Sequence, residues 1–204
     1  MKTNVGPGRP RLVEQRRRGG NPREEILDAA AELFTTHGYA GTSTRKIAEA
    51  VGMRQASLYH HFATKEDILE ALLQSTVAPT LDYARALPPA SDASIAREQL
   101  LALARFDAGQ LAGSRWNLGA LYLLPELRQE RFAEFFGVRT ELARVYSGLS
   151  AQILGDEQDP RCHLPFRLVE MVINLRSDGE IRDTAPSRRR MIDALVSAVD
   201  RLLS

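Results

Sequence analysis

Apolar residues recur at helical spacing from residue 21 onward, and the polar and glycine positions between them mark helix ends. The first apolar face consists of Ile26, Leu27, Ala30, Leu33 and Phe34. Asn21 precedes this segment as an N-cap, Pro22 occupies the first helical position, and Gly38 follows the last turn. Because proline favours helix starts and glycine favours helix ends, these signals predict a helix from Pro22 to the residue before Gly38.

The stretch from Thr42 to Lys65 predicts two short amphipathic helices joined by a turn. In the first, Ile47, Ala48 and Val51 share one face. Gly52 then ends the helix, because glycine adopts the positive φ angle that a tight exit requires. A second helix is expected near Gln55 to His61, with Leu58 and Phe62 one turn apart and facing inward.

The outward side of this second helix carries small, polar and aromatic groups rather than the Lys and Glu of an ordinary solvated face. These groups are Ala56, Ser57 and His60, with Gln55 at the helix start and Tyr59 and His61 on the flanks. Such a pair of helices is typical of a helix-turn-helix that places its second helix in DNA. A plain helical hairpin on a bundle surface fits this segment equally well when it is taken alone.

A further helix is expected to begin after Thr64, whose hydroxyl can cap it with Asp67 three residues later. Lys65 lies in the first turn, where a cation opposes the helix dipole. A lysine beside free helix amides is suited to holding a phosphate, which favours a DNA contact. The alternative is a solvated side chain that is tolerated at a modest cost.

The rest of the chain has helical periodicity and no strand pattern, which predicts an all-α fold of about nine helices. The expected helices run from about Lys65 to Leu87, with a kink or break at Pro79, from Ala93 to Ala112, from Glu130 to Leu154, from Asp159 to near Ser177, and from Pro186 nearly to the end. The stretch from Ser114 to Leu127 is expected to be short and irregular.

Charge is distributed unevenly, although the 204-residue chain has a formal net charge of only +1. Residues 1–20 hold six Lys and Arg against one acid, and residues 66–204 are net acidic. Glycines and prolines in the first twenty residues exclude regular structure, so a flexible basic arm is expected. Arg9 and Arg11 flank Pro10 in a form that suits an A·T-rich minor groove, but a generic phosphate-attracting tail is the favoured interpretation.

Several other classes of protein receive little support. No run of 18 apolar residues indicates a membrane span, and no apolar segment after the first charges indicates a secretory signal, which favours a cytoplasmic protein. Cys162 is the only cysteine, so no internal disulfide is possible. Cys162 and His163 alone make a poor metal site, and neither metal nor cofactor is expected.

The segment from Arg23 to Leu73 resembles the DNA-binding domain of the tetracycline-repressor (TetR) family of bacterial regulators. The residues that match the family pattern are Phe34, Gly38, Tyr39, Thr42, Thr44, Ile47, Ala48, Val51, Gly52, Leu58, Tyr59, His61, Phe62, Lys65 and Leu69. The resemblance implies a homodimeric regulator, in most members a repressor. It also implies three regions, namely the arm at 1–20, a helix-turn-helix domain at 21–66, and an effector-binding and dimerisation domain at 67–204.

The resemblance also implies roles for individual residues at the DNA. Thr44 and Arg45 match positions that touch phosphate or base edges, and Gln55, Ala56 and Ser57 match the base-reading start of the recognition helix. Tyr59 and Lys65 match phosphate contacts, His61 matches a position near the backbone, and His60 has no fixed role but points outward. Arg54 departs from the small or acidic residues of the family, and phosphate contact is its expected use. Gln55 can bond an adenine edge bidentately, Ala56 can meet a thymine methyl, and Arg45 can bridge guanine O6 and N7.

Dimerisation and effector binding are expected in the region after residue 66. The resemblance implies that the last two helices pair across a two-fold axis, through Leu164, Leu168, Met171, Val172, Leu175, Met191, Ile192, Leu195, Val199 and Leu202. Packing within one monomer is the alternative. An effector pocket is expected among Phe106, Trp116, Asn117, Tyr122, Phe132, Phe135, Phe136 and Tyr146, a composition that an ordinary core shares. Sparse unpaired charges favour an apolar or aromatic effector.

The sequence therefore predicts a homodimer that binds a palindromic operator in double-stranded DNA and is released by a small effector. Two copies of a short recognition helix reach half-sites about 34 to 36 Å apart, which supplies affinity that one copy lacks. A regulator that acts through a protein partner is an alternative. An all-α enzyme is disfavoured because Ser57, Tyr59, His60 and His61 cluster with no orienting acid.

Overall fold

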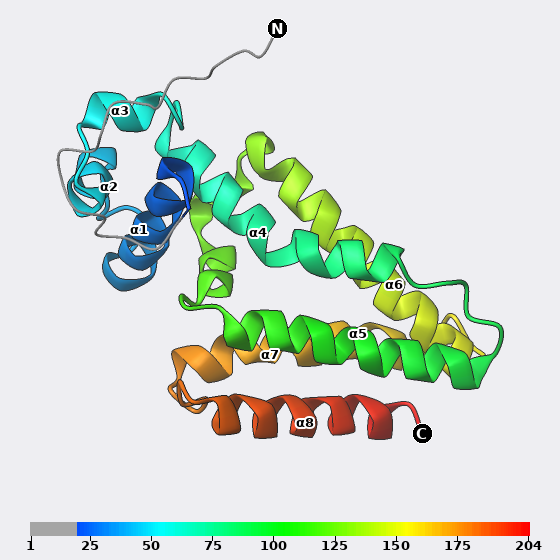
Figure 1. Ribbon diagram of the computed structural model, residues 1–204. Helices are drawn as coiled ribbons and strands as arrows, with labels where there is room; N and C mark the ends of the chain where they lie inside the picture. The colour runs from blue at the N-terminus through cyan, green and yellow to red at the C-terminus, as the bar shows by residue number, and fades with distance from the viewer. Residues whose placement is uncertain (1–19) are drawn as a thin grey trace, which may run out of the picture. The chain divides into compact units, whose positions relative to one another are not determined.

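The computed structural model describes residues 20–204, and these residues form only helices and connecting turns (Figure 1). The all-α prediction is confirmed for this part of the chain. The backbone divides into two compact units between Ile68 and Leu69, and each unit has its own interior. The expected arm, with Arg9 and Arg11, lies outside the described residues.

The first unit contains α1 (Pro22–His37), α2 (Thr44–Val51), α3 (Gln55–Tyr59) and the first residues of α4 (Lys65–Arg85). The predicted start signals are confirmed, since the Asn21 side chain accepts a hydrogen bond from the Glu24 amide behind Pro22. Asp67 and Thr64 form the expected reciprocal cap at the start of α4. The interior of this unit includes Ile26, Ala30, Phe34, Ile47, Val51, Leu58 and Phe62.

The turn between α2 and α3 depends on Gly52, as the sequence predicts. Its φ of 79° and ψ of 31° are left-handed, and its amide donates to the carbonyls at the end of α2. The following helix is shorter than predicted, because α3 ends at Tyr59 rather than at His61. The His61 amide bonds to the Leu58 carbonyl in a tighter turn, and this turn carries the chain to Phe62, which is buried.

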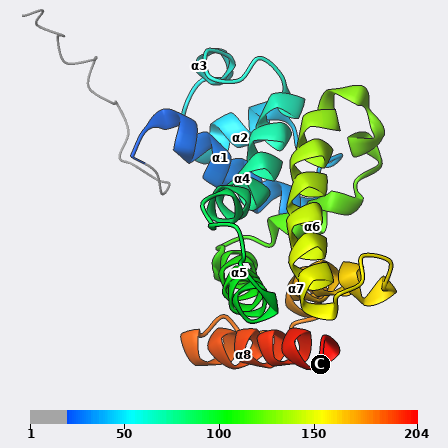
Figure 2. The ribbon, with the colours of Figure 1, turned by 90° about the vertical axis from the view of Figure 1, so that its right-hand side faces the viewer.

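The second unit holds the rest of α4 and the helices that follow. These are α5 (Ala93–Gly113), η1 (Leu118–Leu123), η2 (Pro125–Arg128), η3 (Glu130–Phe132), α6 (Ala133–Leu154), η4 (Pro160–His163), α7 (Leu164–Ser177) and α8 (Ala185–Leu202). Helix α5 packs against α6, α7 and α8, as Figures 1 and 2 show from two sides.

Several predicted helices have different bounds in the structure. The stretch expected to be irregular forms three 3-10 helices, so α6 begins at Ala133 and not at Glu130. A 3-10 helix at Pro160–His163 precedes α7, because Pro165 in its first turn fits a new helix start. The helix through Pro79 is continuous to Arg85, so of the expected kink or break at Pro79, the break does not occur. The described residues therefore form eight α-helices and four 3-10 helices.

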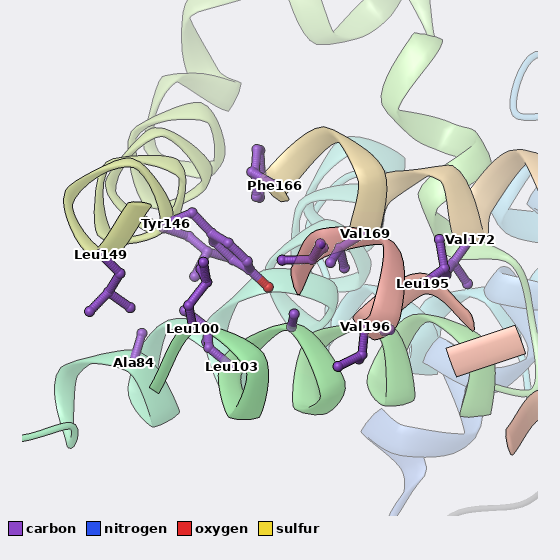
Figure 3. Packing of buried hydrophobic residues seen from close by; sticks show 14 of the residues in the cluster. Ala84, Leu100, Leu103, Tyr146, Leu149, Phe166, Val169, Val172, Leu195 and Val196 are labelled. Atoms are coloured by element: carbon purple, nitrogen blue, oxygen red, sulfur yellow. The ribbon is translucent and has the colours of Figure 1, made fainter. Parts of the chain in front are cut away.

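The core of the second unit lies where α5 meets the other helices. Leu100 and Leu103 of α5, Val169 and Val172 of α7, and Leu195 and Val196 of α8 pack together there (Figure 3). The Tyr146 side chain extends from α6 into this core. Its hydroxyl oxygen, drawn in red in Figure 3, lies among apolar side chains. This oxygen needs a partner, because a buried hydroxyl without a hydrogen bond is costly.

Three residues of the expected dimer interface are buried within one chain. Val172, Leu195 and Val199 have exposed fractions of 0%, 7% and 0%, because they fill the space between α5, α7 and α8 within one chain. Leu164 and Met171 are exposed, and the other expected contacts are half-buried, namely Leu168, Leu175, Met191, Ile192 and Leu202. The interface prediction therefore narrows to these seven side chains.

Among residues 20–204 no helix has the length and apolar character to cross a bilayer.

Candidate nucleic-acid interface

Helix α3 exposes the side chains that the sequence assigned to base reading. Gln55, Ala56 and Ser57 are exposed at its N-terminal end, while Leu58 behind them is fully buried. Tyr59 is a large aromatic residue with 47% of its surface exposed. The buried Leu58 holds the helix on its unit, so the exposed groups have a defined direction.

Three of the predicted DNA contacts form one hydrogen-bonded group, which we name the reading triad: Thr44, Gln55 and Tyr59. The Gln55 Nε2 donates to the Thr44 Oγ1 at 2.9 Å and to the Tyr59 hydroxyl at 3.2 Å. The two hydroxyl oxygens lie 3.1 Å apart and bond each other. The sequence predicts separate roles for these residues, whereas in the structure their hydrogen bonds join α2 to α3.

The two arginines of the interface differ in their freedom. Arg45 pairs with Glu49 one turn later, with a distance of 2.9 Å between Nε and Oε1. Both side chains are exposed, so such a pair is worth about 0.3–0.5 kcal/mol and is easily exchanged for a DNA contact. Arg54 is exposed, and its guanidinium makes no hydrogen bond or ion pair with the described residues. Its guanidinium is available for phosphate.

His60 and His61 are also exposed, in the turn after α3.

Lys65 has contacts that the sequence does not predict. Its Nζ donates to the Tyr39 and Thr42 carbonyls, both at 3.0 Å, and lies 4.0 Å from the centre of the Tyr39 ring. The Tyr39 hydroxyl in turn donates to Glu66 at 3.0 Å. Lys65 thus ties the start of α4 to the loop before α2. The Lys65 ammonium has three N–H donors, and two of them bond these carbonyls. Only the third donor is left for the predicted phosphate contact.

A second polar group lies inside the unit formed by residues 69–204, and we name it the buried triad: Thr80, Asp107 and Tyr146. The Asp107 carboxyl accepts from the Thr80 hydroxyl at 3.2 Å and from the Tyr146 hydroxyl at 3.0 Å. Burial raises the pKa of Asp107 from its ordinary 3.8 to about 7, although both hydrogen bonds lower it. Burial also raises the pKa of Tyr146 well above its ordinary value of 10.

An ion-paired group neighbours the buried triad. Glu170 of α7 accepts from Arg139 of α6 at 2.6 and 2.7 Å, and also from Arg167 at 2.9 Å. The negative charge of Glu170 further raises the pKa of Asp107. Neither group has a signal in the sequence, because a single Asp or Glu in a helix has the same pattern whether it is buried or solvated.

The residues expected to form an effector pocket lie in different surroundings among the described residues. Phe132, Phe135 and Tyr146 are completely buried in the core, and Phe106 stacks on Tyr83 with 4.5 Å between ring centres. Tyr122 and Phe136 line a cavity of about 640 Å³, together with Leu123, Leu124, Leu127, Arg128, Gln129, Glu130 and Ala133. Trp116 and Asn117 line a separate space of about 60 Å³.

The cysteine and the histidine beside it also have ordinary structural roles. The Cys162 thiol is buried and lies 3.4 Å from the Asp156 carbonyl, and burial raises its pKa. The His163 Nδ1 lies within hydrogen-bond distance of the Ser147 hydroxyl. Throughout the described chain, no three side chains of His, Cys, Asp or Glu gather in a way that could hold a metal ion.

A short exposed polar helix that follows a glycine turn, on a small helical core, defines a helix-turn-helix protein of the DNA-binding class. The comparisons agree with this class. The family profile described as bacterial regulatory proteins of the tetR family matches residues 26–72. The chain belongs to this family.

Individual relatives extend the comparison beyond the DNA-binding unit. The crystal structure of AmtR from Mycobacterium smegmatis is 51% identical, covers 93% of this chain and 89% of that chain, and superposes with a TM-score of 0.82. The transcriptional repressor AcnR from Corynebacterium glutamicum is 40% identical over 58 residues, which are 28% of this chain and 31% of AcnR. The repressor KstR2 from Rhodococcus jostii is 28% identical over 127 residues, or 62% of each protein. The chain thus matches about a third of the length of AcnR.

Proposed function

We propose that this chain is a sequence-specific transcriptional repressor that works in the bacterial cytoplasm and binds a palindromic operator as a homodimer. The observation that carries the proposal is the reading triad, an exposed polar group on a short helix that a buried leucine holds in place. Repressor names among the relatives, AcnR and KstR2, support the direction of regulation.

The surface of the second unit supports dimerisation. Leu164 and Met171 of α7 are large apolar side chains with 43% and 44% of their surface exposed. Both belong to the narrowed set of seven, and a second copy of the chain is the partner we propose for them. A dimer doubles the contacts with DNA, because each copy reads one half-site.

The cavity beside Tyr122 and Phe136 supports a small-molecule effector. Its volume of about 640 Å³ lies within the range of ordinary ligand pockets, and its lining combines apolar side chains with Arg128, Gln129 and Glu130. We propose that a small apolar or aromatic effector binds here and releases the operator. Release requires that the effector bind the DNA-free conformation more tightly, by about 1.4 kcal/mol for a tenfold effect.

A gel-shift titration with the DNA that flanks the gene encoding this chain tests the proposal. The wild-type chain is expected to give a saturable complex with a palindromic fragment and much weaker binding to an isolated half-site. Raising the salt concentration should weaken the complex. Protein binding releases cations that are condensed on the DNA phosphates, and this release is less favourable when the salt concentration is high. Absence of a saturable complex, or equal binding to the half-site, would contradict the proposal.

Arg54→Ala sharpens this titration. Arg54 is exposed without an ion pair in the described chain. Its loss should therefore make the negative slope of log affinity against log salt shallower by about 1. Arg189→Ala is the matched control, since Arg189 is an exposed arginine on α8. An unchanged slope for Arg54→Ala would remove this residue from the phosphate contacts.

A further inference from the structure

Thr44 links the side chain of Gln55 to a different helix, and the inference drawn from this link rests on the proposed function. Gln55 is the first residue of α3, whereas Thr44 is the first residue of α2. The Gln55 Nε2 donates to the Thr44 Oγ1 at 2.9 Å and to the Tyr59 hydroxyl at 3.2 Å. Because Tyr59 belongs to α3 itself, the bond to Thr44 is the one that holds the Gln55 amide to α2.

Thr44 is better suited than Tyr59 to fix a position. It is half-buried, and its side chain branches at Cβ, which restricts rotation about χ1. Tyr59 is more exposed, with 47% of its surface open to solvent, and its hydroxyl oxygen lies 3.1 Å from the Thr44 Oγ1. Thr44 therefore bonds both other members of the reading triad and anchors them to α2.

The bonds within the reading triad leave part of the Gln55 amide for DNA. Nε2, the Thr44 Oγ1 and the Tyr59 hydroxyl oxygen form a nearly equilateral triangle, with sides of 2.9, 3.1 and 3.2 Å. Seen from Nε2 the two oxygens are about 60° apart, so one N–H can be shared between them. An amide also has a second N–H and a carbonyl oxygen. These two groups stay available for a base edge.

A held glutamine discriminates between bases better than a mobile one. The side chain turns about three single bonds, and fixing it at a base costs conformational entropy. When Thr44 holds the amide before DNA binds, less of this cost remains for the matching base. A mobile amide can also turn to suit another base, whereas a held amide meets a wrong base with unmatched polar groups. The bond to Thr44 therefore increases the difference in affinity between bases.

We propose that Thr44 is a positioning residue for sequence recognition, which sets base preference through Gln55 without touching the base. A contact between Thr44 and phosphate changes the affinity for every sequence by the same factor. Positioning of Gln55 instead changes the affinity for one sequence relative to another. The ratio of affinities for two operators therefore separates the two roles.

Selection from randomised palindromes identifies the base pair to be tested. The wild type gives the preferred operator, and Gln55→Ala shows which position loses its preference when Gln55 is absent. The preference is then measured as the ratio of dissociation constants for two operators that differ only at this position. Four proteins are compared with the wild type, namely Thr44→Val, Thr44→Ser, Gln55→Ala, and the double variant Thr44→Val with Gln55→Ala.

Thr44→Val removes the hydroxyl and keeps the branched shape. It should lower the ratio roughly 2- to 12-fold, the range of one net hydrogen bond. Thr44→Ser keeps a hydroxyl and should stay within about twofold of the wild-type ratio. In the Gln55→Ala background, Thr44→Val should leave the ratio unchanged, because the side chain that Thr44 positions is gone. Thr36→Val is the matched control and should also leave the ratio unchanged, since Thr36 is an exposed threonine on α1 whose hydroxyl bonds the Glu32 carbonyl.

Tyr59→Phe provides a second variant that acts on the same amide. It removes the other oxygen that the Gln55 Nε2 contacts, and it should lower the ratio at the same position. Urea unfolding shows which variants are folded. If Thr44→Val does not fold, the response of Tyr59→Phe decides whether the triad positions Gln55.

The other outcomes would overturn the inference. If folded Thr44→Val weakens binding to every operator by one factor and keeps the ratio, Thr44 holds phosphate only. If Thr44→Val lowers the ratio equally with and without Gln55, Thr44 reads the base itself. If Gln55→Ala loses preference at no position, Gln55 is not a reader. The proposed function stands in these three cases, whereas failure of the wild type to enrich any sequence would overturn it together with this inference.

Discussion

The reading triad and the buried triad contain the same two hydroxyl types, a threonine and a tyrosine, but one lies at the surface and the other inside. In the reading triad the third member is an amide, and Tyr59 has 47% of its surface exposed. In the buried triad the third member is Asp107, with 4% exposed, and Tyr146 is completely covered. Similar side chains are therefore hydrogen-bonded in water in one triad and in the protein interior in the other.

This difference decides what each group contributes. At the surface, water replaces any hydrogen bond that is lost, so the bonds of the reading triad add little to stability and mainly fix a direction. In the interior no water replaces a lost partner, and an unmatched polar atom carries its full desolvation cost. We therefore expect the reading triad to control which DNA is bound and the buried triad to control stability and its dependence on pH.

The largest expected effect comes from Asp107 and its raised pKa. The folded protein holds the Asp107 proton up to about pH 7, whereas the unfolded chain loses it near pH 3.8. Between these values the folded state binds more protons, so the free energy of unfolding falls as pH rises, and it levels off above pH 7. Asp107→Asn cannot ionise. Its stability relative to the wild type should rise by about 3 kcal/mol between pH 5 and pH 8.

Urea unfolding of both proteins at several pH values measures this difference. Asp193→Asn is the control, because Asp193 is exposed on α8 and pairs with Arg105 at the surface. Its stability difference from the wild type should change by well under 1 kcal/mol over the same range. A flat difference for Asp107→Asn would show that the buried carboxyl titrates normally, and the contrast between the two triads would then be wrong.

A smaller effect is expected from removing one tyrosine hydroxyl in each triad. Tyr146→Phe at pH 8 leaves ionised Asp107 with the Thr80 hydroxyl alone, and it should lower the free energy of unfolding by about 1–3 kcal/mol. Tyr59→Phe removes an exposed hydroxyl, and we expect a change within about 0.5 kcal/mol. Chemical denaturation of both variants gives the comparison. Equal losses would show that exposure does not separate the two triads.

The sequence predicts the helix ends well because the signals for them are local. Asn21, Pro22 and Gly52 act through their own backbone or the next turn, and the structure has each of them in the expected role. The stretch from Ser114 to Leu127 lacks such signals and forms 3-10 helices. The sequence does not predict features that depend on distant partners. Val199 lies on the apolar stripe of the last helix, and the structure buries it in the core with residues of α5 and α7.

The functional residues show the same difference between local signals, which the sequence contains, and contacts with distant residues, which it does not. The sequence placed Gln55 and Tyr59 on the outer side of a short helix, and both are exposed there. It did not indicate their shared bonds with Thr44, because contacts across 11 or 15 residues leave no periodic pattern. Asp107 was missed for the same reason. Its partners Thr80 and Tyr146 come from α4 and α6, and only the fold brings them together.

Lys65 lies between the two extremes, and its removal should have the smallest effect that still separates surface from interior. Its half-buried ammonium holds two carbonyls and the Tyr39 ring, so Lys65→Met should lower the free energy of unfolding by about 1 kcal/mol. Lys46→Met is the matched control, because the exposed Lys46 ammonium holds only the Gly41 carbonyl. That change should cost a few tenths of a kcal/mol. If the two variants unfold alike, then half-burial adds nothing to a lysine–carbonyl bond. The defect of Lys65→Met in a gel shift would then be assigned to phosphate contact and not to the position of α4.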